Sequence, residues 1–503
     1  MQGQPNQLVL RKLGIDTQQE YIVFMRSDSS VCVSEGITSL MRVQISCRGK
    51  TIVATVNAVT GNILGPGEAS LSNRAFEILG ASDGDTIRVS HLSALDSMSL
   101  VRAKIYGRRL EQEHYDIIIQ DIVHGYYSGV HLSAFIAGCV ASKLDRGEVL
   151  GLTRAMLNAG QRMTWPGIVA DKHCVGGIPG NRTTPIVVSI VAENGILIPK
   201  TSSRAITSPA GTADTMEVMA PVNLSLPEIR RVVEKFGGCI AWGGSAKLSP
   251  ADDIFIRVER ALDIDSESQM IASVLSKKAA VGATHVVLDI PVGETAKVRS
   301  EAEAKRLSDL FEDIGAAIGL TVQTVITDGS QPVGRGIGPA LEARDVLCVL
   351  HNANDAPHDL KSKSILIAGQ ILEQCGKAIQ GQGEEMALET LTSGRALSRF
   401  MNICEAQGGF REPRKAQFQH DIVSDRSGRI TSVNNRKIAR LAKLVGAPAD
   451  PCAGIEFLAP AGTRISRGDL LFTLHADSRG QLEYALDYYA RQEDFLQMSE
   501  GAP

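Results

Sequence analysis

The sequence predicts an α/β protein: a helical domain plus a large α/β domain with a mostly parallel central sheet, flanked by a small β-rich N-terminal domain and a C-terminal α+β domain. From about residue 165, strand-like runs alternate with helical segments, which is typical of a parallel sheet covered by helices. Before that point apolar residues recur at helical spacing, and both ends of the chain contain short strand-like runs. We therefore expect four domains, at residues 1–92, 93–163, 164–412 and 413–503.

The N-terminal region is rich in short runs with β-branched residues, separated by polar turns. The runs are QLVLRKLGI, EYIVFM, MRVQISC and KTIVATVNAVTG. We expect them to form a small barrel or sandwich. The next region contains two long stretches, beginning near Ser93 and Ser128, whose apolar residues have helical spacing. These stretches predict a bundle of helices that ends near Gly160.

The third region alternates between strands and helices. Its expected strands are GIVADK, ILIPKTS, GGCIAWG, ATHVVLDIPVG and LTVQTVITDG, and its first expected helix is TTPIVVSIVAENG. In sheets of this kind, ligands bind beyond the carboxyl ends of the strands. The last region, from about residue 413, has strand runs broken by Gly and Pro.

The composition excludes several classes of function. Of the 503 residues, 44% are hydrophobic and 21% are charged, with a net charge of −4 and no basic block. We therefore expect no nucleic-acid partner and no membrane partner. No run approaches the ~20 apolar residues of a membrane span, and the first residues lack the pattern of a secretory signal. Nine scattered cysteines without a C-x-x-C pair indicate reduced thiols, so we expect a cytoplasmic protein without disulfides or a metal site.

The stretch ADKHCVGGIPGNRTTP, at residues 170–185, lies between an expected strand and an expected helix. A loop in this position can direct several backbone N–H groups at one anion, helped by the helix dipole. Lys172 adds positive charge, Thr183 adds a hydroxyl, and the glycines allow close approach of the backbone. The residues alone leave three interpretations open: a phosphate cradle, a thiol site at Cys174 or a metal site, and a plain turn. The loop does not match the P-loop pattern.

A second loop, KTSSRAITSPAGTADTMEV at residues 200–218, also lies between an expected strand and an expected helix. It is again rich in Ser, Thr, Gly and Ala. Two such loops, one βα unit apart, are expected to lie side by side at the carboxyl edge of the sheet. Their hydroxyls and amides together favour the phosphate interpretation.

These two loops resemble the two phosphate-binding motifs of the thymidine phosphorylase and pyrimidine nucleoside phosphorylase family. The second loop is close to the family pattern S-[GS]-R-[GA]-x-x-x-[TA]-[GA]-G-T-x-D-x-x-E. It departs from the pattern at Pro209, where Thr or Ala is usual. The resemblance continues through IASVLSKKAAVGATHVVLDIPVG and VITDGSQPVGRGIGPALE, and it covers residues from about 100 to 490. The added N-terminal region is similar to the long branch of the family, which contains archaeal AMP phosphorylases and bacterial proteins named as thymidine phosphorylases.

The resemblance implies a pentosyltransferase that cleaves thymidine with phosphate to give thymine and 2-deoxyribose 1-phosphate. Two alternatives stay open: a phosphorylase of nucleoside 5′-monophosphates such as AMP, which releases ribose 1,5-bisphosphate, and an enzyme similar to anthranilate phosphoribosyltransferase. The resemblance also implies no cofactor, with inorganic phosphate as a co-substrate, and a homodimer or higher homo-oligomer formed through the helical domain. A non-catalytic homologue is a further alternative, against which the retained site residues argue.

By motif position, the resemblance assigns phosphate binding to residues of both loops. These residues are Lys172, Cys174, Thr183, Ser202 and Thr212. Cys174 stands where the family usually has Ser, and a thiol is a weaker hydrogen-bond donor than a hydroxyl. His173 is expected to face the sugar or the base, and a structural histidine is the alternative.

The other implied site residues surround the sugar and the base. Asp265 is the implied proton donor, with a helix N-cap as the alternative. Lys277 stands four residues after Ser273, so both lie on one helix face, although such lysines are usually solvated. Asp265, His173 and Lys277 form the expected catalytic set. The expected substrate contacts are Gly177, Ser203, Arg204, Ala205, Ile206, Thr207, Ser208, Arg257, Ser273 and Lys297.

Overall fold

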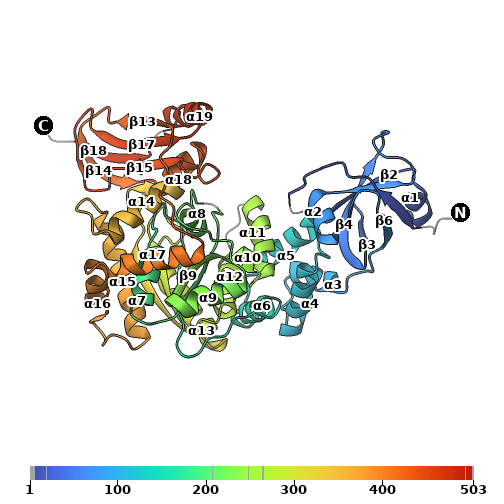
Figure 1. Cartoon of the computed structure of the whole chain (residues 1–503), viewed down its shortest axis with the longest axis horizontal. Coiled ribbons are helices and arrows are strands. Elements are labelled where there is room, and N and C mark those ends of the chain that lie inside the picture. Colours follow the sequence, from blue (N-terminus) through green and yellow to red (C-terminus); the bar gives the residue numbers. More distant parts are fainter. Residues whose placement is uncertain are drawn as a thin grey trace. The chain divides into compact units, whose positions relative to one another are not determined.

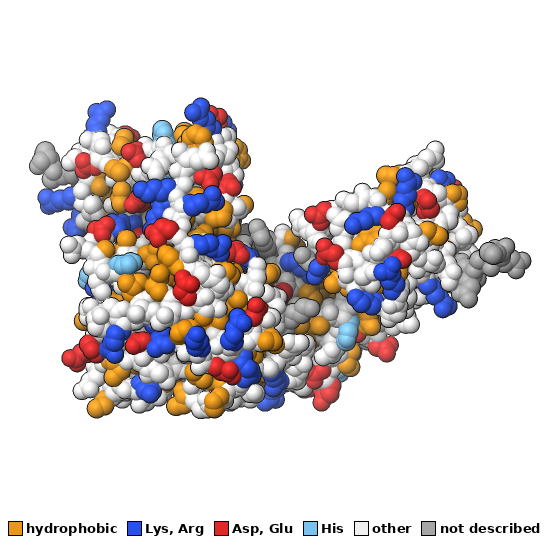
Figure 2. All heavy atoms as spheres, in the orientation of Figure 1, with side chains coloured by type: hydrophobic (Ala, Val, Ile, Leu, Met, Phe, Trp, Pro, Cys, Tyr) orange, Lys and Arg blue, Asp and Glu red, His pale blue; other side chains and the backbone are white. Residues whose placement is uncertain are grey.

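The computed structural model describes residues 6–500 apart from residues 19, 207, 247, 263–265 and 493. The chain divides into two compact units, Met1–Leu144 and Asp145–Pro503. Among the helices of the described part, none combines the length and the apolar character needed to cross a membrane. Figure 2 shows basic and acidic side chains interspersed over the visible surface, in keeping with the small net charge.

The first unit contains a closed β-barrel with the strand order β1-β5-β2-β4-β3-β6 (Figure 1). Alternate side chains of β3, namely Val43, Ile45 and Cys47, are buried, as a half-buried strand requires. The sequence left a barrel and a sandwich open, and the structure shows the barrel. Its elements are β1 (Gln7–Leu10), β2 (Ile22–Arg26), α1 (Ser30–Glu35), β3 (Arg42–Cys47), β4 (Lys50–Val59), β5 (Glu68–Leu71), α2 (Asn73–Leu79) and β6 (Thr86–His91).

The helices that follow the barrel in the first unit are α3 (Ser97–Ile105), α4 (Gln112–Val123) and α5 (Gly129–Ser142). The buried residues of α4 are Tyr115, Ile118, Ile119 and Ile122, which is the spacing of one helix face. The next helix, α6 (Arg146–Asn158), belongs to the second unit, where it packs against α12 (Glu267–Ala280). The region predicted to be helical is therefore helical, and the division between the compact units falls between α5 and α6.

The second unit is built on parallel strands in the orders β11-β10-β7 and β8-β9. A parallel bridge between Val169 and Leu197 places β7 beside β8. Each strand expected from the sequence in this region is present in the structure. Helices cover the sheet (Figure 1), and β8 and β9 are almost fully buried, as in sheets covered on both faces. The remaining elements are β7 (Ala170–Cys174), α7 (Thr184–Glu193), β8 (Ile198–Ser202), α8 (Thr212–Glu217), α9 (Leu226–Phe236), β9 (Gly238–Trp242), α10 (Gly243–Ala246), α11 (Pro250–Leu262), β10 (His285–Val292), α13 (Glu301–Ala317), β11 (Thr321–Asp328), β12 (Gly336–Ile337), α14 (Pro339–Leu350), α15 (His358–Gln374), α16 (Gly383–Thr392) and α17 (Arg395–Gln407).

The C-terminal region of the second unit contains two antiparallel sheets, with the orders β12-β15-β17-β13 and β16-β14-β18 (Figure 1). Strand β12 precedes this region in the chain and pairs with β15, so sheet hydrogen bonds join the C-terminal region to the α/β region. Buried residues of α18, among them Ile438 and Leu441, belong to its core. The elements are β13 (Phe418–Val423), β14 (Gly428–Val433), α18 (Asn435–Leu444), β15 (Gly454–Phe457), β16 (Arg464–Ile465), β17 (Leu470–Ala476), α19 (Arg479–Ala490) and β18 (Leu496–Glu500).

Candidate active site

Strand β7 carries the charged residues of the first glycine loop on two faces of the sheet. Successive side chains of a strand point to opposite faces, so Lys172 and Cys174 lie on one face while Asp171 and His173 lie on the other. Because the strand is parallel to its neighbours, its carboxyl end meets theirs at one edge. This edge is where α/β proteins bind ligands, and the sequence placed both site loops there.

Lys172 and Thr183 are in direct contact. The Lys172 ammonium donates to Thr183 Oγ1 at 2.5 Å, and Lys172 is only 2% exposed. Burial lowers the pKa of Lys172 to about 8, because desolvation disfavours the charged form. Thr183 is the N-cap residue of α7, so the lysine and the positive end of the helix dipole meet at one point. Two of the five residues predicted to bind phosphate are therefore brought together.

A buried carboxylate that the sequence analysis missed lies next to this pair. Asp289 of β10 is fully buried. It accepts a hydrogen bond from Thr327 Oγ1 at 2.5 Å and pairs with Lys363 of α15 at 3.0 Å. Asn181 Nδ2 lies 3.3 Å from Asp289 Oδ2 and 3.2 Å from Cys174 Sγ. A charged residue inside the apolar strand HVVLDIPV was the available signal, because such a residue is rarely buried without a partner.

Cys174 is not a reactive thiolate. Burial is the largest cause that raises the pKa of its thiol to about 12, and the neighbouring Asp289 raises it further. The thiolate is the nucleophilic form of cysteine, and at neutral pH this side chain is a neutral thiol. The structure thus argues against the interpretation of the loop as a thiol site. Among the described residues, no group of three or more His, Cys, Asp or Glu side chains is arranged to hold a metal.

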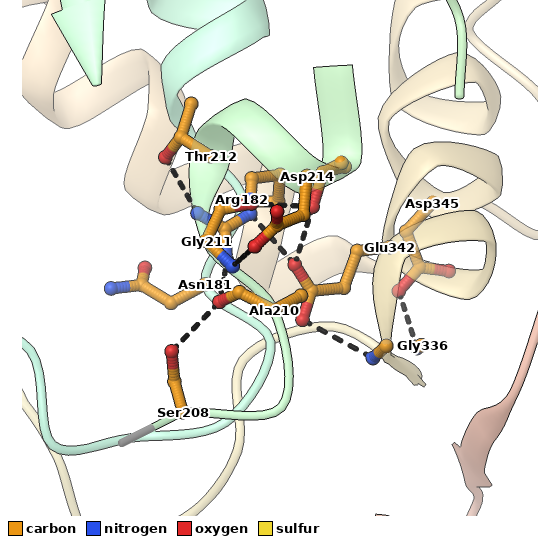
Figure 3. A network of polar contacts seen from close by, with 12 residues as sticks. Asn181, Arg182, Ser208, Ala210, Gly211, Thr212, Asp214, Gly336, Glu342 and Asp345 are labelled. Atoms are coloured by element: carbon orange, nitrogen blue, oxygen red, sulfur yellow. Dashed lines mark hydrogen bonds and ion pairs between the residues drawn. The ribbon is translucent and has the colours of Figure 1, made fainter. Parts of the chain in front are cut away.

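Arg182 joins the two loops, as Figure 3 shows. Its guanidinium donates to Thr212 Oγ1 at 2.6 Å and to the carbonyl of Ala210 at 3.1 Å, both in the second loop. Its Nε pairs at 2.7 Å with the buried carboxylate of Glu342 in α14. That carboxylate also accepts from Thr215 Oγ1 of α8 at 3.0 Å. The loops therefore lie side by side as predicted, although the sequence analysis did not identify Arg182 or Glu342 as the residues that connect them.

Ser202, at the end of β8, has a hydroxyl without a partner. Its Oγ is inaccessible to solvent and makes no hydrogen bond within the described structure. A buried polar group normally has a hydrogen-bond partner, so this hydroxyl is free to donate to a bound oxyanion. The Thr212 hydroxyl accepts from Arg182, which leaves its own proton available for a ligand.

Arg204 does not point towards a free ligand position. Its guanidinium forms two hydrogen bonds with Glu217, at 2.5 and 2.8 Å, contacts Asp214 at 3.2 Å, and lies 4.9 Å from the centre of the Trp242 ring. The Asp214 carboxylate also accepts from the backbone N–H groups of Ala205 and Gly211. The second loop is thus held in a closed turn by its own acidic residues. What it can offer to a ligand is its backbone and its hydroxyls.

The remaining residues expected in this loop are placed as follows. Ser203, Ala205, Ile206 and Ser208 are partly exposed, and Ser208 Oγ donates to the carbonyl of Ala210 at 2.9 Å. Thr207 lies outside the described residues. Gly211 closes the turn: a Cβ atom at this position would lie 2.5 Å from the carbonyl carbon of Arg204. Any side chain at residue 211 would therefore open the loop.

The opposite face of β7 carries a second buried charge cluster, formed by Asp171, Lys200 of β8 and Lys278 of α12. Asp171 Oδ2 lies 2.9 Å from the Lys278 ammonium, and Oδ1 lies 3.5 Å from that of Lys200. All three side chains are at most 4% exposed. Burial and the nearby lysines lower the pKa of His173 well below its ordinary value. His173 is therefore a neutral imidazole.

The residues expected to hold the base lie on α11 and α12. Ser273 and Lys277 are half-buried on one face of α12, as predicted, and the Lys277 ammonium pairs with Asp252 of α11 at 2.7 Å. Asp252 lies in the first turn of α11. Arg257 is exposed on the same helix.

Asp265, the expected proton donor, lies outside the described residues. The neighbouring Ser266 is the N-cap of α12, and its hydroxyl accepts from the Gln269 N–H at 3.4 Å. The backbone of Lys297 lies beside the first loop: a Cβ atom on Gly177 would lie only 2.3 Å from the backbone nitrogen of Lys297. Gly177 also has a φ of +92°, a conformation that favours glycine. The loop after β10 therefore lies directly against the first glycine loop.

Comparison with known proteins bears on this site. Family models match residues 98–160 (glycosyl transferase family, helical bundle domain), 167–397 (glycosyl transferase family, a/b domain) and 429–492 (pyrimidine nucleoside phosphorylase C-terminal domain). A Hahella chejuensis protein named "Putative thymidine phosphorylase" is 52% identical over 500 residues, which cover 99% of both chains. A protein of the same name from Legionella pneumophila is 52% identical over 498 residues, covering 99% of this chain and 96% of its own. The chain belongs to the pyrimidine nucleoside phosphorylase family.

Membership of this family confirms the resemblance found in the sequence and makes the chain a pentosyltransferase of the nucleoside phosphorylase class. The solved structure of anthranilate phosphoribosyltransferase (TrpD) from Thermus thermophilus is also similar, with a TM-score of 0.51 and 18% identity. The similarity covers 61% of this chain and 98% of the Thermus chain. At this identity, the likeness shows a shared fold only.

The pKa of Lys172 predicts how a phosphorylase of this family responds to pH. As pH rises through about 8, the free enzyme loses the ammonium, so kcat/KM for phosphate is expected to fall there. The variant Lys172→Arg keeps its charge at alkaline pH, since a guanidinium does not deprotonate in proteins. We expect the alkaline decline to be absent from its pH profile, even though its maximal activity is lower. An identical decline in both enzymes would assign the titration to another group.

Cys174 gives a second prediction for this family member. The variant Cys174→Ser is expected to lower KM for phosphate by about threefold, because a hydroxyl is a stronger donor than a thiol. Steady-state kinetics with phosphate varied would measure the change. Cys348→Ser, which alters a partly buried thiol on α14, is the matched control. A rise in KM would show that the Asn181–Cys174 contact matters more than donor strength.

Proposed function

We propose that this protein cleaves thymidine by phosphorolysis, giving thymine and 2-deoxyribose 1-phosphate. The observation that carries the proposal is the group of donors at the carboxyl ends of β7 and β8. It comprises the Lys172–Thr183 pair, the unpartnered Ser202 hydroxyl and the Thr212 hydroxyl held by Arg182. Such a group suits a phosphate dianion. The two relatives that are 52% identical carry the name thymidine phosphorylase, which supports this substrate.

In the proposed reaction a phosphate oxygen forms a bond to the anomeric carbon while the bond from that carbon to the base nitrogen breaks. The base leaves with the bonding electrons and takes up a proton. An oxocarbenium-like transition state of this kind is stabilised by the phosphate negative charge, which Lys172 holds in position. The neutral His173 is proposed to contact the sugar or the base without adding a competing positive charge.

The base is proposed to lie against α11 and α12. Arg257, Ser273 and Lys277 are its proposed contacts, and Asp265 its proposed proton donor. The pairing of Lys277 with Asp252 fixes the direction of the lysine side chain before substrate arrives. Release of base from thymidine, uridine, AMP, CMP and UMP, each with and without phosphate, tests the proposal. Phosphate-dependent release of thymine from thymidine is expected, and its absence would overturn the proposal.

A second candidate function is phosphorolysis of nucleoside 5′-monophosphates. The loop that carries Lys297 lies against Gly177 of the first loop, with the Lys297 backbone in contact; because the resemblance assigns Lys297 to the substrate, we propose it as the contact of the additional phosphate in this candidate. Arg204 does not contribute, since its guanidinium is bound by Glu217 and Asp214. With adenosine and cytidine added to the same assay, release of base from a monophosphate but not from the matching nucleoside would select the second candidate.

A further inference from the structure

The buried ion pair between Asp289 and Lys363 lies on the same face of the sheet as Lys172. In the parallel pairing of β10 with β7, Asp289 stands opposite Cys174, and Val287 stands opposite Lys172. Because side chains alternate between the two faces along each strand, the Asp289 carboxylate shares its face with Lys172 and Cys174. Lys363 reaches this face from α15, which packs on β10, and its ammonium lies 3.0 Å from Asp289 Oδ2. The pair therefore borders the residues assigned to phosphate without being one of the assigned ligands.

Neither charge of the pair is in contact with water. Asp289 is fully buried, and the Lys363 ammonium is inaccessible to solvent. The carboxylate also accepts from Asn181 of the first glycine loop, at 3.3 Å, and from Thr327, at 2.5 Å. The Lys363 ammonium makes no well-aligned hydrogen bond within the described part of the chain, so the ion pair is what compensates its charge. Asp289 thus holds the first loop, and Lys363 balances the negative charge that this contact brings beside the phosphate site.

The other acidic groups near Lys363 face a cavity of about 380 Å³ that the lysine also borders. They are Asp328 of β11, Asp359 of α15 and Glu384 of α16. Among the described residues, Asp289 is the acidic group that forms an ion pair with Lys363. The lysine charge is therefore directed at Asp289 rather than at the cavity.

Both members of the pair act electrostatically on Lys172. Burial is the main cause that lowers the pKa of Lys172 to about 8. Among its neighbours, Cys174 and Asp289 act to raise this pKa, while Lys363 and Arg182 act to lower it. Removing either member of the pair would consequently change the charge state of Lys172, and the two removals would act in opposite directions.

We propose that Lys363 is a positioning residue of the phosphate site, which neutralises Asp289 so that the Lys172 ammonium stays on Thr183 and remains available to a phosphate dianion. That ammonium donates to Thr183 Oγ1 at 2.5 Å. A carboxylate without a partner on the same face would attract the ammonium and repel the dianion. Lys363 contacts neither substrate and acts through Asp289. The proposal rests on the assignment of Lys172 to the attacking phosphate in the proposed function.

Calorimetric titration with inorganic phosphate, from about pH 6.5 to about pH 10, tests this role without depending on turnover. Affinity is calculated for the phosphate dianion at each pH. In the wild type we expect affinity to fall as pH rises through about 8, where Lys172 loses its proton. In Lys363→Met, phosphate is expected to bind about tenfold more weakly at neutral pH. Its alkaline decline should move to higher pH, because Lys363 no longer lowers the pKa of Lys172.

Two further variants separate this role from packing. Asp289→Asn should move the decline to lower pH, because the carboxylate no longer raises the pKa of Lys172. The double variant Asp289→Asn/Lys363→Met removes both charges and is expected to bind phosphate within about threefold of the wild type, with its decline again near that of the wild type. Removing both members of a buried pair is often neutral for stability, whereas removing one is strongly destabilising. Lys361→Met, two residues earlier on α15 and partly exposed, is the matched control and should leave the affinity unchanged.

The results that contradict the positioning role are specific. A decline that stays at the wild-type pH in the single variants, or a double variant that binds as weakly as Lys363→Met, overturns it. An equal loss in Lys361→Met would reduce the effect to general charge and would also overturn it. Circular dichroism identifies any single variant that does not fold. In that case the other single variant must show its displacement and the double variant its reversal, or the role is overturned.

The positioning role and the proposed function can fail separately. If phosphate binding responds to the variants as expected but thymidine releases no base, the positioning role stands and the proposed function fails. If thymidine is cleaved while Lys363→Met binds phosphate as the wild type does, the proposed function stands and the positioning role fails.

Discussion

Replacing Lys172 with methionine is expected to lower kcat/KM for phosphate by about 100- to 1,000-fold, the loss typical for a preorganised charge-stabilising donor. Methionine keeps much of the length of the side chain and its apolar stem, but it removes the ammonium that lies 2.5 Å from Thr183 Oγ1. The phosphate dianion would then face the helix N-terminus without the neighbouring positive charge. Steady-state kinetics with phosphate varied at pH 7 measures the effect.

Lys305→Met is the matched control for this change. Lys305 is exposed on α13, so the same substitution there removes one surface charge and should leave kcat/KM unchanged. Circular dichroism should show that both variants are folded. A Lys172→Met enzyme that retains activity within about threefold of the wild type would contradict the assignment of Lys172 to the attacking phosphate.

The order and type of most helices and strands could be predicted, because the sequence patterns that indicate them are local. The strands of the α/β region are short apolar runs bounded by glycine loops, and the structure confirms each of them. Helix α4 follows from the spacing of Tyr115, Ile118, Ile119 and Ile122. The N-terminal region left both a barrel and a sandwich open, because alternation shows which face of a strand is buried but does not show whether the sheet closes.

The candidate site was predictable only in its loops. Lys172, Thr183, Ser202 and Thr212 were assigned to phosphate by motif position through the family resemblance, and the closeness of the two loops follows from parallel strands. The residues that organise these loops come from remote segments. Arg182 and Glu342 are 160 positions apart, and the Thr327 and Lys363 contacts with Asp289 also span large separations. Pairing over such distances leaves no periodic pattern in a single sequence.

One kind of long-range contact does leave a signal in the sequence. A charged residue in an apolar strand indicates that a buried partner of opposite charge exists, even when that partner is unknown. Asp289 in HVVLDIPV belongs to this class, whereas Asp171 in VADKHC lies beside Lys172 and His173 and gave no such signal. The structure shows that each is paired with lysines from other elements: Asp289 with Lys363, and Asp171 with Lys200 and Lys278. The two aspartates lie on opposite faces of the sheet, so buried ion pairs lie on both faces of β7.

Replacing Asp171 with asparagine is expected to lower the free energy of unfolding of the second unit by about 3–5 kcal/mol. The change preserves the shape of the side chain but leaves the ammonium groups of Lys200 and Lys278 buried without a carboxylate. Both tryptophans, Trp165 and Trp242, belong to this unit, so urea denaturation followed by tryptophan fluorescence reports on it.

The pH dependence distinguishes this cause of destabilisation from a loss of packing. Burial lowers the pKa of Lys278 in the folded wild type to about 7, although the Asp171 carboxylate acts to raise it. Without that carboxylate the folded-state pKa falls further, so below about pH 7 the folded variant releases a proton that the folded wild type still binds. The deficit of Asp171→Asn should accordingly shrink as pH rises to about 7 and stay constant above it. Asp309→Asn, at an exposed position of α13, is the control and should change stability by less than about 0.5 kcal/mol. A deficit for Asp171→Asn that is independent of pH would mean that the unpaired lysine charges are not its cause, because the asparagine Oδ1 can still accept the hydrogen bond that the Lys172 backbone N–H donates to Asp171 at 2.7 Å.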